Sequence, residues 1–423
     1  MSTMRFGMLA VGAVALLSTA TAHAQSAATC SFDGPSATLT ITVDGIAAVV
    51  TRTGPGQIRL NNVACAGATV TTTDTIVVNG GELVDPVTVT GSFAPGLTTE
   101  ETGTSEIEWT FDMGAGNDNV RINFNDVPST VIFTAGGIDI ANDGDEDMTT
   151  SGIEKLRIYT STGDDTIDAS SYLGGAVLLW GLAGNDSLYG GPGLDTLYGQ
   201  AGNDTLYGGD GGDTMIGGPG DDFYYGEGGN DKFKQDAGLD GNDSFDGGTG
   251  IDTVDYSKRT VGVTVTMDDG LANDGEPGSE ADFVDLSVEN ATGGAGDDVL
   301  VGSDALNVLT GNDGDDQLFG GRGGDELHGG NGADVLTGDN GNDQLFGDGG
   351  ADSIDGGGGN DTLFGGVGID SITGGDGADS MFGEGGNDVI FNSDAFADSV
   401  DCGSGPSDDA EVDPLDTLTG CEL

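Results

Sequence analysis

Aspartate residues recur at every ninth position over two long stretches of the sequence, and their carboxylates are the groups with the clearest chemistry. In the unit from Gly190 to Tyr198, for example, Asp195 follows a glycine-rich segment and precedes Leu197. Like charges in regular rows are unfavourable unless a cation neutralises them. Ca²⁺ accepts roughly 6–8 oxygen ligands and tolerates irregular geometry, whereas Mg²⁺ demands a near-ideal octahedron and zinc prefers His or Cys. The residue types therefore predict calcium binding.

The nine-residue unit also predicts the elements that position each aspartate. Glycines at positions one, two and four permit positive φ and hence a tight turn. Positions seven to nine form a short strand whose central residue, large and apolar, points inward. Two units then make one coil, the coils stack by parallel pairing, and the aspartates at position six come into line.

The repeats form two arrays, at residues 181–255 with a break at 235–246, and at residues 293–391 as 11 units in unbroken phase. Asn307 replaces the aspartate in one unit, where we expect a weaker site. The predicted metal ligands are Asp186, Asp195, Asp204, Asp213, Asp222, Asp231, Asp252, Asp298, Asp316, Asp325, Asp334, Asp343, Asp352, Asp361, Asp370, Asp379 and Asp388.

This unit resembles the hemolysin-type calcium-binding (RTX) nonapeptide repeat, G-G-x-G-x-D-x-U-x, where U is a large apolar residue. The resemblance implies an all-β fold, a right-handed parallel β-roll or β-solenoid, with Ca²⁺ as the cofactor between stacked turns. Many RTX proteins carry an enzyme, toxin or adhesin ahead of the repeats, and many are exported by an uncleaved C-terminal signal. This chain departs from that export pattern, because the signal that we expect in it lies at the N-terminus, within residues 1–24.

The rest of the chain divides by composition. Residues 1–24 read as a signal peptide, with Arg5, an apolar run and the small-x-small site at Ala22 to Ala24. Residues 25–180 are β-rich and read as irregular coils of the same solenoid, with a separate β-sandwich over 25–110 as the alternative. Residues 256–292 read as an excursion between the arrays, and residues 392–423 as a C-terminal cap that protects the last strand edge.

Four cysteines in an exported chain predict disulfides, for which three connectivities exist. Their spacing favours the local pairs Cys30–Cys65 and Cys402–Cys421.

The charge balance excludes several functions. The 423 residues include 73 acidic and only 11 basic ones, for a net charge of −62. Nucleic-acid binding needs a basic surface, and no segment is long and apolar enough for a membrane span.

No catalytic histidine motif is present, and His328 at position nine of a repeat reads as a solvated side chain.

We therefore expect a non-enzymatic, exported calcium-binding protein that folds when Ca²⁺ binds, with a structural or interaction role. We expect it to be secreted and extracellular, with the periplasm and the cell surface as alternative destinations. One alternative function is a calcium-dependent surface adhesin or matrix protein with a cell-surface or matrix partner. A polysaccharide hydrolase that uses paired carboxylates is the other.

Overall fold

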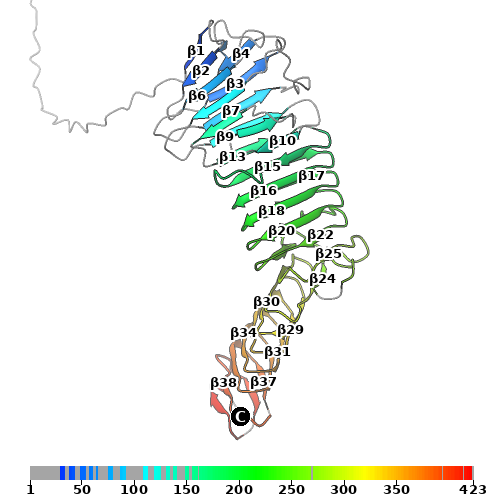
Figure 1. Ribbon diagram of the computed structural model, residues 1–423. Coiled ribbons are helices and arrows are strands. Elements are labelled where there is room, and N and C mark those ends of the chain that lie inside the picture. The colour runs from blue at the N-terminus through cyan, green and yellow to red at the C-terminus, as the bar shows by residue number, and fades with distance from the viewer. Residues whose placement is uncertain are drawn as a thin grey trace, which may run out of the picture.

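The computed structural model describes residues 155–160, 162–267, 270–392, 394–412 and 414–421, and, between residues 29 and 151, the strands alone. The described part is a parallel β-solenoid without helices, whose strands form three sheets (Figure 1). No described helix could serve as an apolar membrane-spanning segment.

Three sheets, which we call A, B and C, form the walls of the solenoid. Sheet A comprises β1 (Thr29–Asp33), β2 (Thr38–Thr42), β6 (Thr75–Asn79), β8 (Glu108–Asp112), β10 (Thr130–Phe133), β11 (Gly137–Ile140), β12 (Met148–Ser151), β14 (Thr166–Asp168), β16 (Ser187–Gly193), β18 (Thr205–Gly211), β20 (Phe223–Gly228), β22 (Ser244–Asp246) and β25 (Phe283–Val284). Sheet B comprises β3 (Ala48–Thr53), β4 (Gln57–Leu60), β5 (Val63–Ala64), β7 (Pro86–Gly91), β9 (Asn119–Phe124), β13 (Lys155–Tyr159), β15 (Val177–Ala183), β17 (Thr196–Ala201), β19 (Thr214–Ile216), β21 (Lys232–Lys234), β23 (Thr253–Asp255), β26 (Asn290–Thr292), β28 (Val308–Asp313), β30 (Glu326–Gly332), β32 (Gln344–Gly350), β34 (Thr362–Gly368), β36 (Ser380–Gly386), β38 (Ser399–Asp401) and β40 (Thr417–Thr419). Sheet C comprises β24 (Thr264–Thr266), β27 (Val299–Val301), β29 (Gln317–Gly323), β31 (Val335–Gly341), β33 (Ser353–Gly358), β35 (Ser371–Asp376), β37 (Val389–Asn392) and β39 (Asp409–Val412).

The register of the repeat strands follows the nine-residue period. In the second array each strand pairs in parallel with the strand two further along the chain, so that Leu309 lies beside Leu327 and Leu327 beside Leu345. Two units therefore complete one coil, as predicted.

The N-terminal strands continue sheet B but also leave the coil path. β7, β9, β13 and β15 pair in parallel, so this wall runs unbroken into the first array. Antiparallel pairing interrupts the parallel pattern at β1–β2 and β10–β11–β12 in sheet A and at β3–β4–β5 in sheet B.

The apolar residues at position eight form the core, as the repeat predicts. Leu197, Leu206, Leu318 and Leu336, among others, are fully buried between the walls. Burying one such side chain contributes roughly 1.5–3 kcal/mol. The core is one residue wide per strand, so these contacts hold neighbouring rungs together and do not extend sideways.

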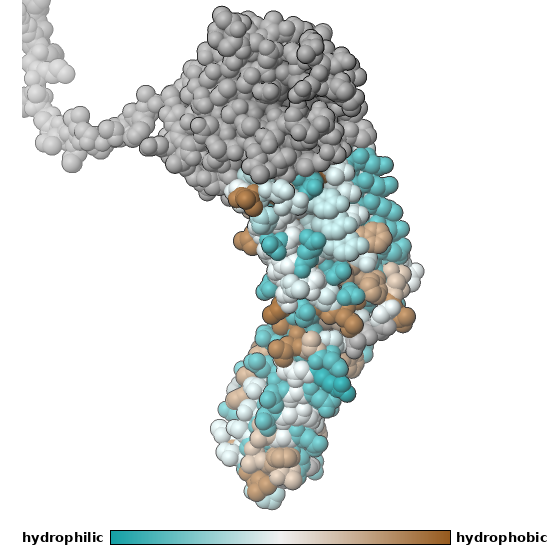
Figure 2. Space-filling view, in the orientation of Figure 1, coloured by the Kyte–Doolittle hydropathy of each residue, from teal (hydrophilic) through white to brown (hydrophobic). Residues whose placement is uncertain are grey.

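A junction interrupts the rod between the arrays. Sheet A ends at β25 and sheet C begins at β24, whereas sheet B continues through β23, β26 and β28. Figure 1 shows the solenoid changing direction near β24 and β25. Brown, hydrophobic residues gather around this bend in Figure 2, and Leu239, Ile251, Leu271, Leu286 and Leu306 of this region are more than half exposed.

Candidate calcium sites

The turns take the backbone conformation that the glycines permit, with one correction. Positive φ occurs at positions two and four, as at Gly321 (99°) and Gly323 (138°), and even Asp339 at position two adopts 68°. The glycines at position one do not have positive φ, contrary to our expectation. They are glycine because an added Cβ would collide: at Gly338 it would lie 2.6 Å from Oδ2 of Asp343.

All seventeen predicted aspartates lie inside the coil, with side chains no more than 2% exposed. In each of them Oδ1 accepts a hydrogen bond of 2.7–3.0 Å from a backbone N–H of the preceding rung. Where the nine-residue phase is unbroken the donor lies 18 residues earlier, so that Asp325 N–H donates to Asp343. For Asp252, which follows the break, the donor Asp231 lies 21 residues earlier. The carboxylates thus stack in two rows along the solenoid.

The second oxygen of these carboxylates has no partner. Oδ2 is buried and unbonded in sixteen of the seventeen, the exception being Asp298, whose Oδ2 accepts a hydrogen bond from Gly294 N–H at 2.6 Å. Leaving a buried charged acceptor unsatisfied costs several kcal/mol. So regular a set of orphaned oxygens indicates a ligand.

A second set of oxygens converges on the same space. A Cβ built at Gly338 would lie 2.6 Å from the carbonyl oxygen of Gly356, one rung further on, as well as 2.6 Å from Oδ2 of Asp343. Carbonyl oxygens at positions two and four also face the next rung, since a Cβ at Gly357 would lie 2.2 Å from the oxygen of Asp339. Each slot between turns is therefore lined by carboxylate and carbonyl oxygens.

Burial raises the pKa values of these carboxyl groups, because it disfavours their charged form. Desolvation raises the pKa of Asp186 to about 7 and that of Asp222 to about 8, although a backbone N–H lowers it in each case. In the second array burial raises the pKa of Asp343 to about 6. Burial therefore penalises the ionised form of these groups, and a bound cation would favour it.

The donor set fits a hard cation. Within the described residues no three His, Cys, Asp or Glu side chains converge on one point. An ion in the slot would therefore draw on backbone carbonyls together with carboxylates, the ligands that Ca²⁺ accepts.

A family comparison agrees with this geometry. The model of the RTX calcium-binding nonapeptide repeat matches residues 178–206, 198–233, 237–255, 292–327, 319–354, 328–363 and 355–390. The two arrays are RTX calcium-binding repeats. Among curated proteins, none matches this chain.

Asn307 shows what happens to an RTX slot without a carboxylate. Its Oδ1 accepts from Ser303 N–H at 2.7 Å, and its side-chain amide donates to the carbonyl of Glu289. Neither side-chain polar atom of Asn307 is left over, unlike Asp325 on the next rung, whose Oδ2 is orphaned. The hydrogen-bonding groups of the asparagine side chain thus all find partners in the protein, whereas one oxygen of the aspartate side chain does not.

Three further aspartates share the geometry although they lie outside the predicted set. Asp243, Asp398 and Asp408 are buried, each receives a backbone N–H on Oδ1, and each has an orphaned Oδ2. Insertions displace them from the nine-residue phase, with donors 21, 19 and 20 residues earlier. The short D-x-U pattern marks Asp243 and Asp398 in the sequence, whereas the small Ala410 follows Asp408.

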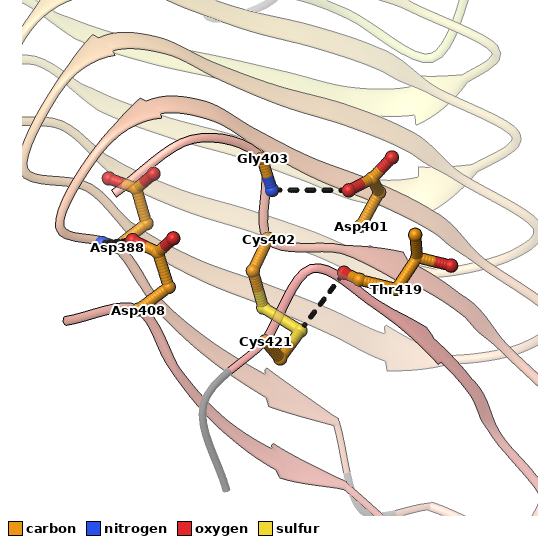
Figure 3. The surroundings of a disulfide bond; sticks show 7 residues. All are labelled: Asp388, Asp401, Cys402, Gly403, Asp408, Thr419 and Cys421. Carbon is orange, nitrogen blue, oxygen red and sulfur yellow. Dashed lines mark hydrogen bonds between the residues drawn. A yellow bond between two sulfur atoms is a disulfide. The ribbon is translucent and has the colours of Figure 1, made fainter. Parts of the chain in front are cut away.

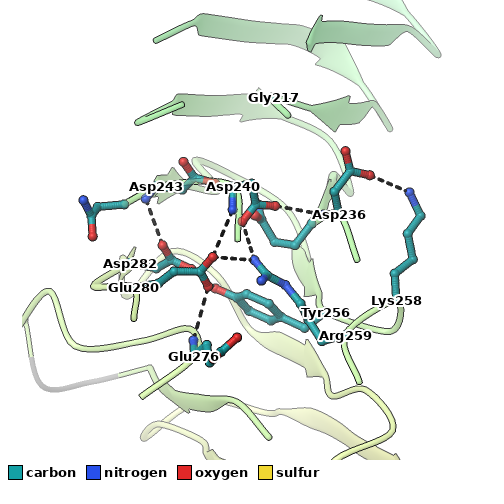
Figure 4. Close-up of polar contacts among 12 residues, drawn as sticks. Gly217, Asp236, Asp240, Asp243, Tyr256, Lys258, Arg259, Glu276, Glu280 and Asp282 are labelled. Carbon is teal, nitrogen blue, oxygen red and sulfur yellow. Dashed lines mark hydrogen bonds and ion pairs between the residues drawn. The ribbon is translucent and has the colours of Figure 1, made fainter. Parts of the chain in front are cut away.

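At the junction between the arrays, a hydroxyl and a guanidinium of the protein contact buried carboxylates (Figure 4). The Tyr256 hydroxyl donates to Oδ2 of Asp282 at 2.7 Å, and the buried Arg259 guanidinium pairs with Asp240 and with Glu280. Desolvation and the charge of Asp282 raise the pKa of Asp243, whose Oδ2 is orphaned, to about 10.

The C-terminal end is closed by the predicted bond between Cys402 and Cys421, at an S–S distance of 2.01 Å (Figure 3). It joins the turn after β38 to the turn after β40, the last strand of sheet B. The predicted Cys30–Cys65 pair lies outside the described residues, because Cys65 is not among them.

His328 is part-exposed, stacks on Phe346 at 4.5 Å and contacts Glu326 at 2.9 Å, so it belongs to the outer surface of sheet B.

Proposed function

We propose that this chain is an exported, calcium-binding RTX repeat protein whose solenoid folds as Ca²⁺ occupies the slots between its turns. The observation that carries this proposal is the set of sixteen buried Oδ2 atoms that have no hydrogen-bond partner. A buried carboxylate is costly unless it is paired or protonated, and a bound cation would pair it without loss of its charge.

The predicted aspartates, together with the carbonyls at position one, would hold the ions. For the slot at Asp343 these are Oδ2 of that residue and the carbonyl oxygen of Gly356. Bound calcium supplies positive charge that keeps the carboxylates ionised and links one rung to the next. The backbone N–H on Oδ1 fixes the carboxylate so that Oδ2 points into the slot.

Folding and binding are coupled in this proposal, because the slots exist only when successive rungs are stacked. Binding free energy then appears as folding free energy. Extracellular calcium modules typically bind at about 10⁻⁴–10⁻³ M. The chain would stay unfolded where calcium is scarce and would fold after export.

Export is supported by two features. Residues 1–24 have the charge, apolar run and cleavage site of a signal peptide. The Cys402–Cys421 disulfide fits an oxidising compartment outside the cytosol. We propose a structural or interaction role without catalysis for the exported solenoid.

Circular dichroism of the purified chain in excess chelator, and then in millimolar Ca²⁺, tests the coupling. We expect a coil spectrum in chelator and a β spectrum with calcium, with Mg²⁺ at the same concentration as the control. Metal analysis after gel filtration should recover several calcium ions per chain. A β spectrum unchanged by chelator, together with a metal-free protein, would refute the proposal.

A further inference from the structure

Basic residues are distributed very unevenly over this acidic solenoid. Seven of the 11 lysines and arginines lie on strands of sheet B, and the described strands of sheet A carry none. The seven are Arg52, Arg59, Arg121, Lys155, Arg157, Lys232 and Lys234. All lie at or before the end of the first array, so the basic residues of the described strands are concentrated in one part of sheet B.

Aromatic side chains occupy the centre of this face. Tyr159, Trp180 and Tyr198 follow one another on successive strands of sheet B, with ring centroids 4.1 and 5.0 Å apart and nearly parallel planes. The register of β19 and β21 continues this column from Ile216 towards Lys234, whose partner on the next strand, Asp255, forms an ion pair with Lys232. Rings stacked in this way present a ridge of apolar edges and polar tips along the solenoid axis.

An open depression of about 540 Å³ lies at the far end of the ridge. Tyr198, Gln200, Thr214 and Ile216 line one part of it, and the ammonium-bearing side chains of Lys234 and Lys258 line the other. Lys258 pairs with Asp236 at 2.9 Å. Among the described residues no carboxylate pairs with Lys234, which leaves one positive charge for a ligand in a chain of net charge −62.

The distance between the basic side chains on this face indicates which class of polyanion could bind there. Arg157 and Lys234 lie four strand steps apart, roughly 19 Å at the usual strand separation. Only neutral side chains lie between them in these two outward columns. A nucleic acid, with a phosphate about every 3.4 Å along each strand, would place most of its charges over neutral or acidic surface. A linear polysaccharide with neutral sugars between its carboxylates matches the pattern.

We propose that the outer face of sheet B, from Arg157 to Lys258, binds an extended acidic polysaccharide in which uronate residues alternate with neutral sugars. The aromatic ridge and the threonines of β17 and β19 contact the neutral sugars, and Lys234 binds a carboxylate. This surface is separate from the calcium slots and adds a partner to the proposed function.

Isothermal titration calorimetry of the full chain at fixed millimolar calcium tests this surface. The probe is a hyaluronate oligosaccharide, compared with a neutral dextran oligosaccharide and with oligo-dT of similar length. We expect hyaluronate to bind more tightly than the other two. Lys234→Gln should weaken it about two- to fivefold, the scale of an exposed ion pair.

Arg322→Gln is the matched control, because Arg322 is 70% exposed on sheet C, away from this face. It removes the same charge and should leave binding unchanged. Tyr198→Ala should weaken hyaluronate binding while the calcium-dependent circular dichroism is retained. Equal losses in Lys234→Gln and Arg322→Gln, equal binding of dextran, tighter binding of oligo-dT, or no binding of hyaluronate would overturn the proposal. Because the calcium response is recorded on the same samples, this failure is distinguishable from failure of the proposed function.

Discussion

The hydroxyl of Tyr256 donates a 2.7 Å hydrogen bond to Oδ2 of Asp282, the oxygen that has no partner in almost every other rung. This rung is therefore closed by a neutral donor and needs no ion. The irregular segment between the arrays thus supplies its own donor to this carboxylate.

Replacing Tyr256 by phenylalanine should destabilise the protein in calcium by about 1–3 kcal/mol, because a buried acceptor loses its donor. Thermal unfolding followed by circular dichroism measures the change. Tyr207→Phe is the control, since Tyr207 stacks between Tyr189 and Tyr225 on the outside of sheet A. A loss of equal size in both variants would show that Tyr256 acts only through its ring.

Asp343→Asn should have opposite effects with and without calcium. In calcium we expect a loss of roughly 1–3 kcal/mol, because a charged ligand becomes a neutral amide. In chelator the variant should keep more β signal than the parent chain, since burial raises the pKa of Asp343 and penalises its charge. Asp355→Asn on the exposed face of β33 should change neither. Destabilisation of Asp343→Asn in both conditions would contradict a calcium-specific role.

Gly338→Ala should abolish the calcium response of its slot. The new methyl group would lie 2.6 Å from both Oδ2 of Asp343 and the carbonyl of Gly356, and such overpacking costs about 1–3 kcal/mol. Gly349→Ala is the matched control, because the nearest atom to its Cβ would be 3.6 Å away. Calcium titration of both variants, with bound metal measured at saturation, should show one site fewer only in Gly338→Ala.

Calcium-free protein should gain stability as the pH falls. Burial raises the folded-state pKa of Asp186 to about 7 and of Asp222 to about 8, above the unfolded value near 3.9. The folded state then binds more protons than the unfolded state, so stability is fully present below about pH 4 and lost as the pH rises through about 8. Circular dichroism in chelator between these limits measures it. In saturating calcium the trend should reverse, because protons compete with the ion; a parallel trend in both would refute the model.

Reduction of the Cys402–Cys421 bond should loosen the C-terminal rungs. The bond closes a loop with a sequence separation of 19 residues, for which the chain-entropy estimate is about 3 kcal/mol. Hydrogen exchange should accelerate in β38 and β40 after reduction, while β30 and β32 stay protected. Uniform acceleration along the second array would show that the bond stabilises more than the end.

The repeat predicted the positions of most buried carboxylates because its period is also the geometric period of the coil. Asp325 and Asp343 are 18 residues apart, and one turn of the solenoid places them on adjacent rungs. Asp243, Asp398 and Asp408 escaped prediction because insertions change the length of the coil without changing which backbone N–H meets the carboxylate. The closure of a rung by Tyr256 could not be predicted, because it depends on a contact 26 residues away in an irregular segment.

The continuity of sheet B has a mechanical consequence. At the junction sheet A ends and sheet C begins, and only β23, β26 and β28 carry strand pairing from one array to the next. Tension applied between the two ends of the rod would concentrate on these short strands and on the Arg259 ion pairs beside them. The junction is therefore where the molecule should yield first under load, with each array still intact on its own side.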